Sequence, residues 1–135
     1  INIRLFAMVN DKYGAGRIGD IDGILVSKFN ELVESILNTK SIRTNEFFHK
    51  IKEVKRIAIL PGSGTQFIDE IIEDVDIFVT GDISHRYLLK ADDARVGLLQ
   101  IGHISSEIPG MKRFVNKLNN ALSKELEYIY REFYE

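Results

Sequence analysis

Short apolar runs alternate with stretches of helical periodicity through residues 56–101, and this alternation constrains the fold more than any other feature. Apolar runs occupy 56–60, 76–80 and 98–101. Between them, 65–73 carries apolar residues at helical spacing, and Ser84 is a plausible N-cap for a helix that runs to about Ala94. Strands that alternate with helices of this length are typical of βαβ units and a parallel sheet. We therefore expect an α/β fold with a mostly parallel sheet and flanking helices.

The first half of the chain is less regular. After the apolar run 1–9, residues 10–20 contain three glycines and are expected to form a loop. Apolar residues at helical spacing from Ile24 to Leu37 predict an amphipathic helix that ends near Asn38. The segment 39–55 favours a short strand or hairpin.

The carboxyl-terminal region is expected to contain one further helix. Pro109-Gly110 should interrupt the chain before an amphipathic helix from Met111 to Leu122. The aromatic-rich tail 126–134 is compatible both with an extension of that helix and with an edge strand.

Length and composition indicate one domain and exclude several kinds of site. A chain of 135 residues with 44% apolar residues can bury one core, and its lack of cysteine excludes disulfides, thiolate metal sites and cysteine nucleophiles. The net charge of −2 gives no general attraction for nucleic acid. Neither a signal peptide nor an apolar span of membrane length is visible, so we expect a cytoplasmic protein without a membrane partner. Because the chain opens at Ile1 within an apolar run, we expect it to be part of a longer protein.

Three glycine-containing loops follow the three predicted strands, at 61–64, 81–85 and 102–107. Parallel strands end at the same edge of a sheet, where α/β proteins usually build their sites. We expect these loops to be neighbours.

The third loop offers a potential metal site. His103 follows a buried strand and Glu107 lies four residues later, so an imidazole and a carboxylate can converge on one cation. Two ligands make only half a site, since a catalytic metal uses three or more protein ligands. In the alternative interpretation, His103 caps the strand exit and Glu107 lies at an exposed helix start.

The first two loops suggest a ligand cleft. The amides of Gly62, Ser63 and Gly64 precede a predicted helix and could bind an anion, although these glycines could equally serve only a tight turn. Asp82 could ligate a metal, orient His103 as a supporting residue that does not itself bind the metal, or cap the next helix. His85 could shuttle protons or form a structural hydrogen bond.

Four segments together resemble a known family, the Nif-three-like proteins named GTP cyclohydrolase 1 type 2 homologues. They are Tyr13-Gly-Ala-Gly-Arg-Ile-Gly-Asp20, Ile57-Ala-Ile-Leu-Pro-Gly-Ser-Gly64, Phe78-Val-Thr-Gly-Asp-Ile-Ser-His85 and Ile101-Gly-His-Ile-Ser-Ser-Glu107. The resemblance covers nearly the whole chain and corresponds to the carboxyl-terminal half of that family. It implies that residues 1–135 form a single α/β domain, the carboxyl-terminal portion of a longer two-lobed protein.

The resemblance also implies a metal site. It makes His103 and Glu107 ligands of a pair of divalent metal ions, with Gly62 to Gly64 and Gly81-Asp82 lining the same cleft. The family's other ligands, a paired-histidine motif and a histidine-and-aspartate motif in an amino-terminal half, are absent from this sequence. We therefore expect this chain alone to bind metal weakly. The family also forms homo-hexamers, which implies a homo-oligomer.

Two functions remain open. In the first, the parent protein is a metal-dependent hydrolase of a phosphate-containing or cyclic small molecule. In the second, it is a non-catalytic regulatory scaffold that contains metal and binds protein or nucleic-acid partners. The sequence shows no basic stripe interleaved with aromatic residues that would support nucleic-acid binding.

We further expect truncation of His103 to cost little stability, and truncation of Ile59 or Phe78 to cost several-fold more.

Overall fold

The computed structural model describes residues 2–122, which form one mixed six-stranded sheet with helices on both faces. The strand order is β1-β2-β4-β5-β6-β3. The strands are β1 (Ile3–Asn10), β2 (Tyr13–Leu25), β3 (Arg43–Thr44), β4 (Glu53–Ser63), β5 (Ile77–Asp82) and β6 (Gly97–Gln100). The helices are α1 (Val26–Leu37), α2 (His85–Asp93) and α3 (His103–Ala121), and the short 3₁₀ segments are η1 (Phe47–Lys50) and η2 (Thr65–Glu70).

The prediction of a mostly parallel sheet is wrong. Only β4, β5 and β6 run parallel; β1 pairs antiparallel with β2, β2 with β4, and β3 with β6. The parallel part corresponds to the alternating segments of the sequence, where η2 and α2 make the crossovers. The antiparallel part comes from the first half of the chain, where a hairpin connects β1 to β2.

Residues 10–20, expected to be a loop, belong mostly to β2. The glycines mislead here because they serve close packing within a strand rather than a turn. A side chain at Gly16 would place its Cβ 2.1 Å from Cε1 of Phe6, a fully buried core residue of β1. Gly16 therefore makes room for the Phe6 ring, and the strand continues through it.

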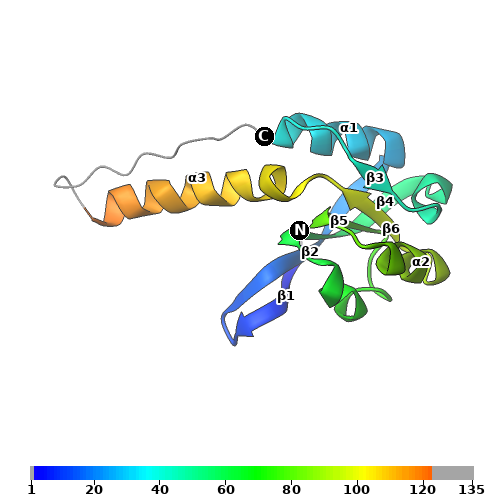
Figure 1. The fold of residues 1–135 in the computed structure, drawn as a ribbon, viewed down its shortest axis with the longest axis horizontal. Coiled ribbons are helices and arrows are strands. Elements are labelled where there is room, and N and C mark those ends of the chain that lie inside the picture. Colours follow the sequence, from blue (N-terminus) through cyan, green and yellow to red (C-terminus); the bar gives the residue numbers. More distant parts are fainter. Residues whose placement is uncertain (1, 123–135) are drawn as a thin grey trace.

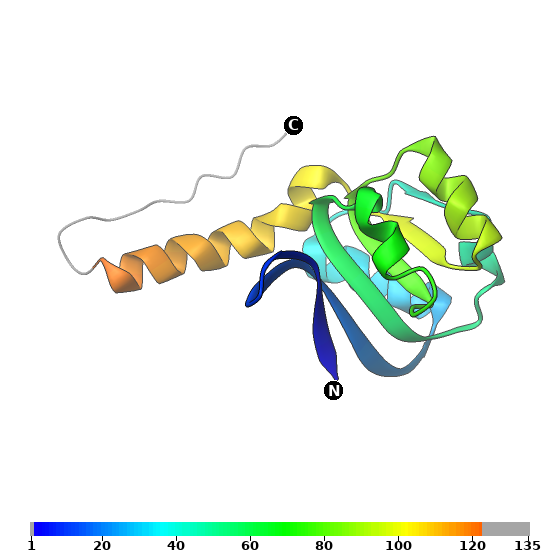
Figure 2. The ribbon, with the colours of Figure 1, turned by 90° about the horizontal axis from the view of Figure 1, so that it is seen from below.

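The sheet separates two hydrophobic clusters. Along β5, Phe78 points to the face covered by η2 and α2, and its ring makes an edge contact with Phe6, with centroids 6.0 Å apart. Ile77 and Val79 point to the opposite face, which packs against α1 and η1. β5 is therefore buried on both sides, as expected for the central strand of a three-layer α/β fold (Figure 2).

The helices differ from expectation mainly at their ends. Helix α1 begins at Val26, two residues later than predicted, and ends as predicted at Asn38, whose left-handed conformation caps it. Predicted helix 65–73 is instead a 3₁₀ segment from Thr65 to Glu70. The tail 126–134 lies outside the described residues.

Helix α3 begins at His103 and runs without a break past Pro109, so the predicted interruption at Pro109-Gly110 is wrong. A proline inside a helix removes one amide donor, and its ring crowds the carbonyl four residues earlier, which disfavours the helix. Its fixed φ is nevertheless a helical one, and α3 continues through Pro109. The result is a long helix that extends away from the sheet (Figure 1). No helix within residues 2–122 is long and apolar enough to cross a membrane.

Candidate metal-binding site

The three glycine-containing loops meet at one edge of the sheet, as the sequence predicted. The Gly62 amide donates to Ser106 Oγ at 2.8 Å, which joins the end of β4 to the first turn of α3. A Cβ at Gly81 would lie 2.5 Å from the Gly62 carbonyl oxygen and 2.8 Å from His103 Cα. Glycine at position 81 therefore allows the start of α3 to lie directly against the ends of β4 and β5.

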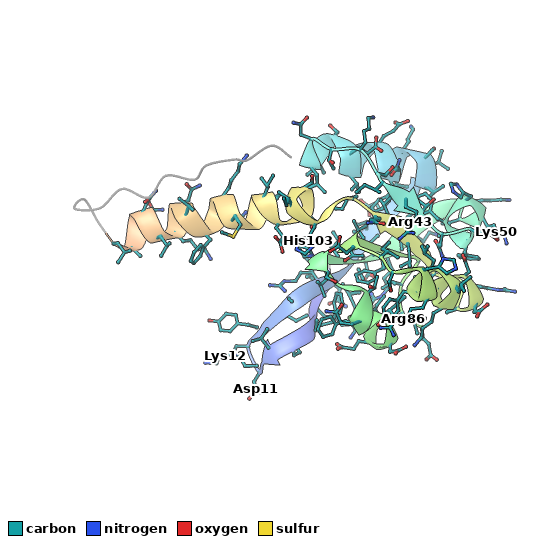
Figure 3. The ribbon with its side chains drawn as sticks, viewed as in Figure 1. Asp11, Lys12, Arg43, Lys50, Arg86 and His103 are labelled. Atoms are coloured by element: carbon teal, nitrogen blue, oxygen red, sulfur yellow. The ribbon has the colours of Figure 1, made fainter. Side chains whose placement is uncertain are left out.

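His103 lies where α3 leaves the sheet (Figure 3). Its Nδ1 lies 2.5 Å from Asp82 Oδ2 and its Nε2 lies 3.3 Å from Glu107 Oε1. All three side chains are about half exposed. The imidazole is thus held between two carboxylates that lie at its two different nitrogens.

This environment raises the pKa of His103 above its ordinary value of 6.5. The hydrogen bond with Asp82 is the main cause, and the negative charges of Asp82 and Glu107 add to it, while partial desolvation opposes them. A carboxylate only accepts hydrogen bonds. When the ring is neutral with its proton on Nδ1, the Nε2 lone pair therefore faces the Glu107 oxygen. Two electron-rich atoms that face each other make a favourable position for a proton or a metal cation.

The geometry around Nε2 is suitable for a divalent ion. Two ligand atoms each about 2.1 Å from a tetrahedral ion are about 3.4 Å apart, and the separation of His103 Nε2 from Glu107 Oε1 is 3.3 Å. Gly62 borders the same space. An added Cβ there would lie 2.6 Å from Glu107 Oε1 and 3.3 Å from His103 Nε2.

In the loop expected to bind an anion, two of the amides already hydrogen-bond to side chains of this chain. The Gly62 amide donates to Ser106 Oγ and the Gly64 amide donates to Thr80 Oγ1 at 3.1 Å. Gly62 has a φ of +69°, and Ser63 pairs with Asp82 in the β4–β5 register. The segment after the loop is a 3₁₀ turn rather than an α-helix. This arrangement favours the alternative in which the two glycines serve a tight turn.

Asp82 and His85 also take definite positions. Asp82 contacts His103 and does not cap α2, whose N-cap residue is Ser84, although the Ser84 side chain makes no capping hydrogen bond. His85 begins α2, and within residues 2–122 it makes no hydrogen bond to Asp82, His103 or Glu107.

Two residues of the site were not identified from the sequence, Thr80 and Ser106. Both are buried, and their hydroxyl groups contact Gly62: Thr80 Oγ1 donates to the Gly62 carbonyl at 3.3 Å, and Ser106 Oγ accepts from the Gly62 amide at 2.8 Å. Ser106 Oγ also donates to the His103 carbonyl at 2.6 Å. A hydroxyl residue at the end of an otherwise apolar strand was the available signal for Thr80.

A model of the Duf34/NIF3 (NGG1p interacting factor 3) family matches residues 2–134. The chain belongs to the Duf34/NIF3 family. This confirms the resemblance seen in the four sequence segments.

Among Duf34/NIF3 relatives, the GTP cyclohydrolase 1 type 2 homolog of Borreliella burgdorferi is 34% identical over 126 residues, which cover 92% of this chain and 49% of the relative. The homolog of Pyrococcus abyssi is 31% identical over 122 residues, covering 82% of this chain and 48% of the relative. The chain thus spans about half the length of the curated relatives it matches.

Solved structures show the same fold. Reduced HcgD from Methanocaldococcus jannaschii superposes with a TM-score of 0.71 at 24% identity, covering 94% of this chain and 48% of that chain. A hypothetical protein of Staphylococcus aureus superposes with a TM-score of 0.68 at 29% identity, covering 85% of this chain and 39% of that chain.

Proposed function

We propose that His103 and Glu107 form half of a divalent metal centre, and that the complete protein is a metal-dependent hydrolase of a phosphate-containing or cyclic substrate. The observation that carries the proposal is the 3.3 Å separation of His103 Nε2 from Glu107 Oε1, with the other ring nitrogen held by Asp82. Support for the hydrolytic reaction is indirect: it comes from the name of the relatives, GTP cyclohydrolase 1 type 2 homolog.

The ligand set within this chain is incomplete. Residues 2–122 contain no cluster of three or more histidine, cysteine, aspartate or glutamate side chains that could hold a metal ion. A catalytic metal uses at least three protein ligands. We therefore propose that the remaining ligands lie in the part of the relatives' length that this chain does not match, and that this chain alone binds metal weakly.

A bound divalent ion would polarise a substrate oxygen and bring the pKa of a bound water near neutrality. The residues of this chain supply the binding geometry. His103 and Glu107 lie one turn apart on α3, and Ser106 between them fixes that turn to Gly62 of β4. Both proposed ligands project from one helical turn that Ser106 attaches to β4, so their separation is set before any ion binds.

The proposal is tested with the full-length protein, stripped of metal by a chelator and reloaded separately with Zn²⁺, Mn²⁺ or Mg²⁺. Hydrolysis of GTP, of other nucleoside phosphates and of cyclic phosphodiesters is then measured. We expect chelation to abolish hydrolysis and one of the metals to restore it. His103→Ala and Glu107→Gln should each lower kcat/KM by at least about 100-fold.

His49→Ala is the matched control, since His49 contacts Thr44 at 2.9 Å and belongs to η1 rather than to the site. It should retain wild-type activity. Hydrolysis that survives chelation, or that falls equally in His49→Ala and His103→Ala, would contradict the proposal.

A further inference from the structure

We infer that Asp82 is a positioning residue that keeps the proton of His103 on Nδ1, so that Nε2 presents its lone pair to the ion shared with Glu107. This inference deepens the proposed function and rests on it. It concerns how the site chooses one of two possible metal-ligating nitrogens.

A neutral imidazole carries a single proton, and here two carboxylates compete for it. Asp82 Oδ2 lies 2.5 Å from Nδ1, while Glu107 Oε1 lies 3.3 Å from Nε2. A donor–acceptor distance beyond about 3.2 Å corresponds to a weak hydrogen bond, whereas the contact between Asp82 and Nδ1 lies within ordinary hydrogen-bonding reach. The proton therefore stays on Nδ1, where it hydrogen-bonds to Asp82, and the lone pair of Nε2 is available to a metal ion.

The position of Asp82 is fixed by the sheet and not by α3. Asp82 is the last residue of β5, and its backbone is registered with Ser63 of β4. Its carboxylate reaches His103 because Gly81 allows α3 to begin so close to the strand ends. The contact thus ties the ring to a rigid strand, while Glu107 lies on the same helix as His103.

Removal of Asp82 should move the proton. In Asp82→Ala, Glu107 is the only one of the two carboxylates that remains, and a proton on Nε2 can then hydrogen-bond to Glu107. That tautomer occupies the ligand position, so a metal must displace the proton before it binds. Loss of such a supporting carboxylate typically costs about 10–100-fold in metal affinity. Asp82→Asn keeps an oxygen acceptor for Nδ1–H and should restore most of the affinity.

The experiment uses full-length protein labelled with ¹⁵N-histidine. Nitrogen chemical shifts report the His103 tautomer at alkaline pH without metal, with the signal assigned by its loss in His103→Ala. Zn²⁺ affinity is measured by competition with a chelating dye. Asp69→Ala is the control, because Asp69 is an exposed aspartate paired with Lys90 outside the site.

We expect the Nδ1–H tautomer in the wild type, Asp69→Ala and Asp82→Asn, and the Nε2–H tautomer with about 10–100-fold weaker Zn²⁺ binding in Asp82→Ala. If Asp82→Ala retains the Nδ1–H tautomer and wild-type affinity, the inference is overturned, even when its stability falls. If the wild type does not bind Zn²⁺, the proposed function fails, and the tautomer measurement still decides the role of Asp82 separately.

Discussion

The missing side chain of Gly62 leaves open the space beside Glu107: a Cβ at position 62 would lie 2.6 Å from Glu107 Oε1. Gly62 also has a φ of +69°, a conformation that residues with a Cβ rarely adopt. The glycine is therefore required both by the backbone turn and by the space that the candidate ion would use.

Gly62→Ala should accordingly lose metal binding in the full-length protein and lower stability by about 1–2 kcal/mol. Gly110→Ala is the control, since a Cβ at Gly110 in α3 meets no atom within 4 Å. Alanine there should raise stability by up to about 1 kcal/mol and leave metal affinity unchanged. Urea midpoints measure the stability of each variant, and Zn²⁺ titrations measure its metal affinity. Wild-type Zn²⁺ affinity in Gly62→Ala would show that the ion lies elsewhere.

Truncation of the site histidine should be tolerated far better than truncation of the core. His103 is half exposed, so His103→Ala should change stability by no more than about 1 kcal/mol. Phe78 is fully buried, and Phe78→Ala should cost about 3–5 kcal/mol. Chemical denaturation measures both, and a collapse of stability in His103→Ala would make this histidine structural.

The sequence-based expectation for Ile59 needs correction. The sequence predicts that truncation of Ile59 costs as much as truncation of Phe78, but Ile59 is 39% exposed. Ile59→Ala should therefore cost less than about 2 kcal/mol, clearly below Phe78→Ala in the same denaturation series.

A buried asparagine should matter as much as an apolar core residue. Asn45 is buried; its amide group donates to the Val96 carbonyl at 2.8 Å, and its oxygen accepts from the Leu98 amide at 2.7 Å. Asn45→Ala leaves these two buried groups without their partner and should cost about 1–3 kcal/mol. The exposed Asn116→Ala is the control, and equal urea midpoints for the two variants would contradict the role of Asn45.

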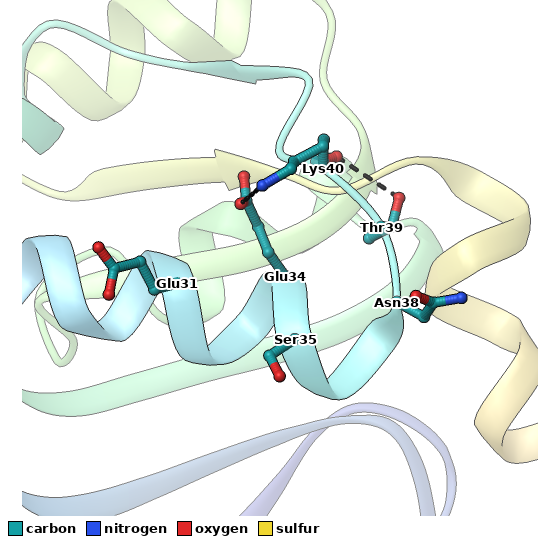
Figure 4. Close-up of a pocket in the computed structure, with 6 residues that line it drawn as sticks. All are labelled: Glu31, Glu34, Ser35, Asn38, Thr39 and Lys40. Carbon is teal, nitrogen blue, oxygen red and sulfur yellow. Dashed lines mark hydrogen bonds and ion pairs between the residues drawn. The ribbon is translucent and has the colours of Figure 1, made fainter.

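Glu34 should make stability depend on pH in the acid range. The Ser41 amide, Lys40 and the Ser41 hydroxyl donate to its carboxylate and lower its pKa from 4.5 to about 2. Figure 4 shows the contact with Lys40. A folded-state pKa below the unfolded value means that this stabilisation is complete above about pH 4.5 and is lost as the pH falls toward 2.

Glu34→Gln should therefore be less stable than the wild type at neutral pH, and the difference should shrink as the pH falls below 4.5. Urea midpoints measured across this range test it. Glu31→Gln is the control, because it removes a carboxylate from the same helix without touching the Ser41 contacts. A gap between wild type and Glu34→Gln that stays constant with pH would exclude this account of Glu34.

The parallel half of the fold was predictable because there sequence period and structure agree. Between residues 56 and 101, apolar runs of strand length alternate with predicted helices, and this alternation is typical of a parallel α/β sheet. The three loops meet because parallel strands end at the same edge of the sheet. The antiparallel half was not predictable, because glycines at 14, 16 and 19 indicate a loop unless the Phe6 ring that fills the space at Gly16 is known. The contact between Gly16 and the Phe6 ring, which the sequence does not show, accounts for glycine within this strand.

The closeness of His103 and Glu107 was predictable from the sequence, but the contacts that hold them in place were not. His103 and Glu107 are visible as an imidazole and a carboxylate four residues apart, and their meeting follows from helical geometry. The roles of Thr80, Ser106 and the Gly62 amide depend on contacts between three separate elements, β5, α3 and β4. For Asp82, the sequence left three roles open, and only the observed contact with His103 Nδ1 distinguishes orientation from helix capping.

The central claim, that His103 and Glu107 bind one cation, is tested most directly by anomalous diffraction from crystals of the full-length protein grown with Zn²⁺ or Mn²⁺. Data collected at the metal's absorption edge should show a peak about 2.0–2.6 Å from both His103 Nε2 and a Glu107 oxygen, with Asp82 still bonded to Nδ1. A fully loaded crystal in which the peak lies away from these two side chains, or in which His103 binds no metal, would contradict the account.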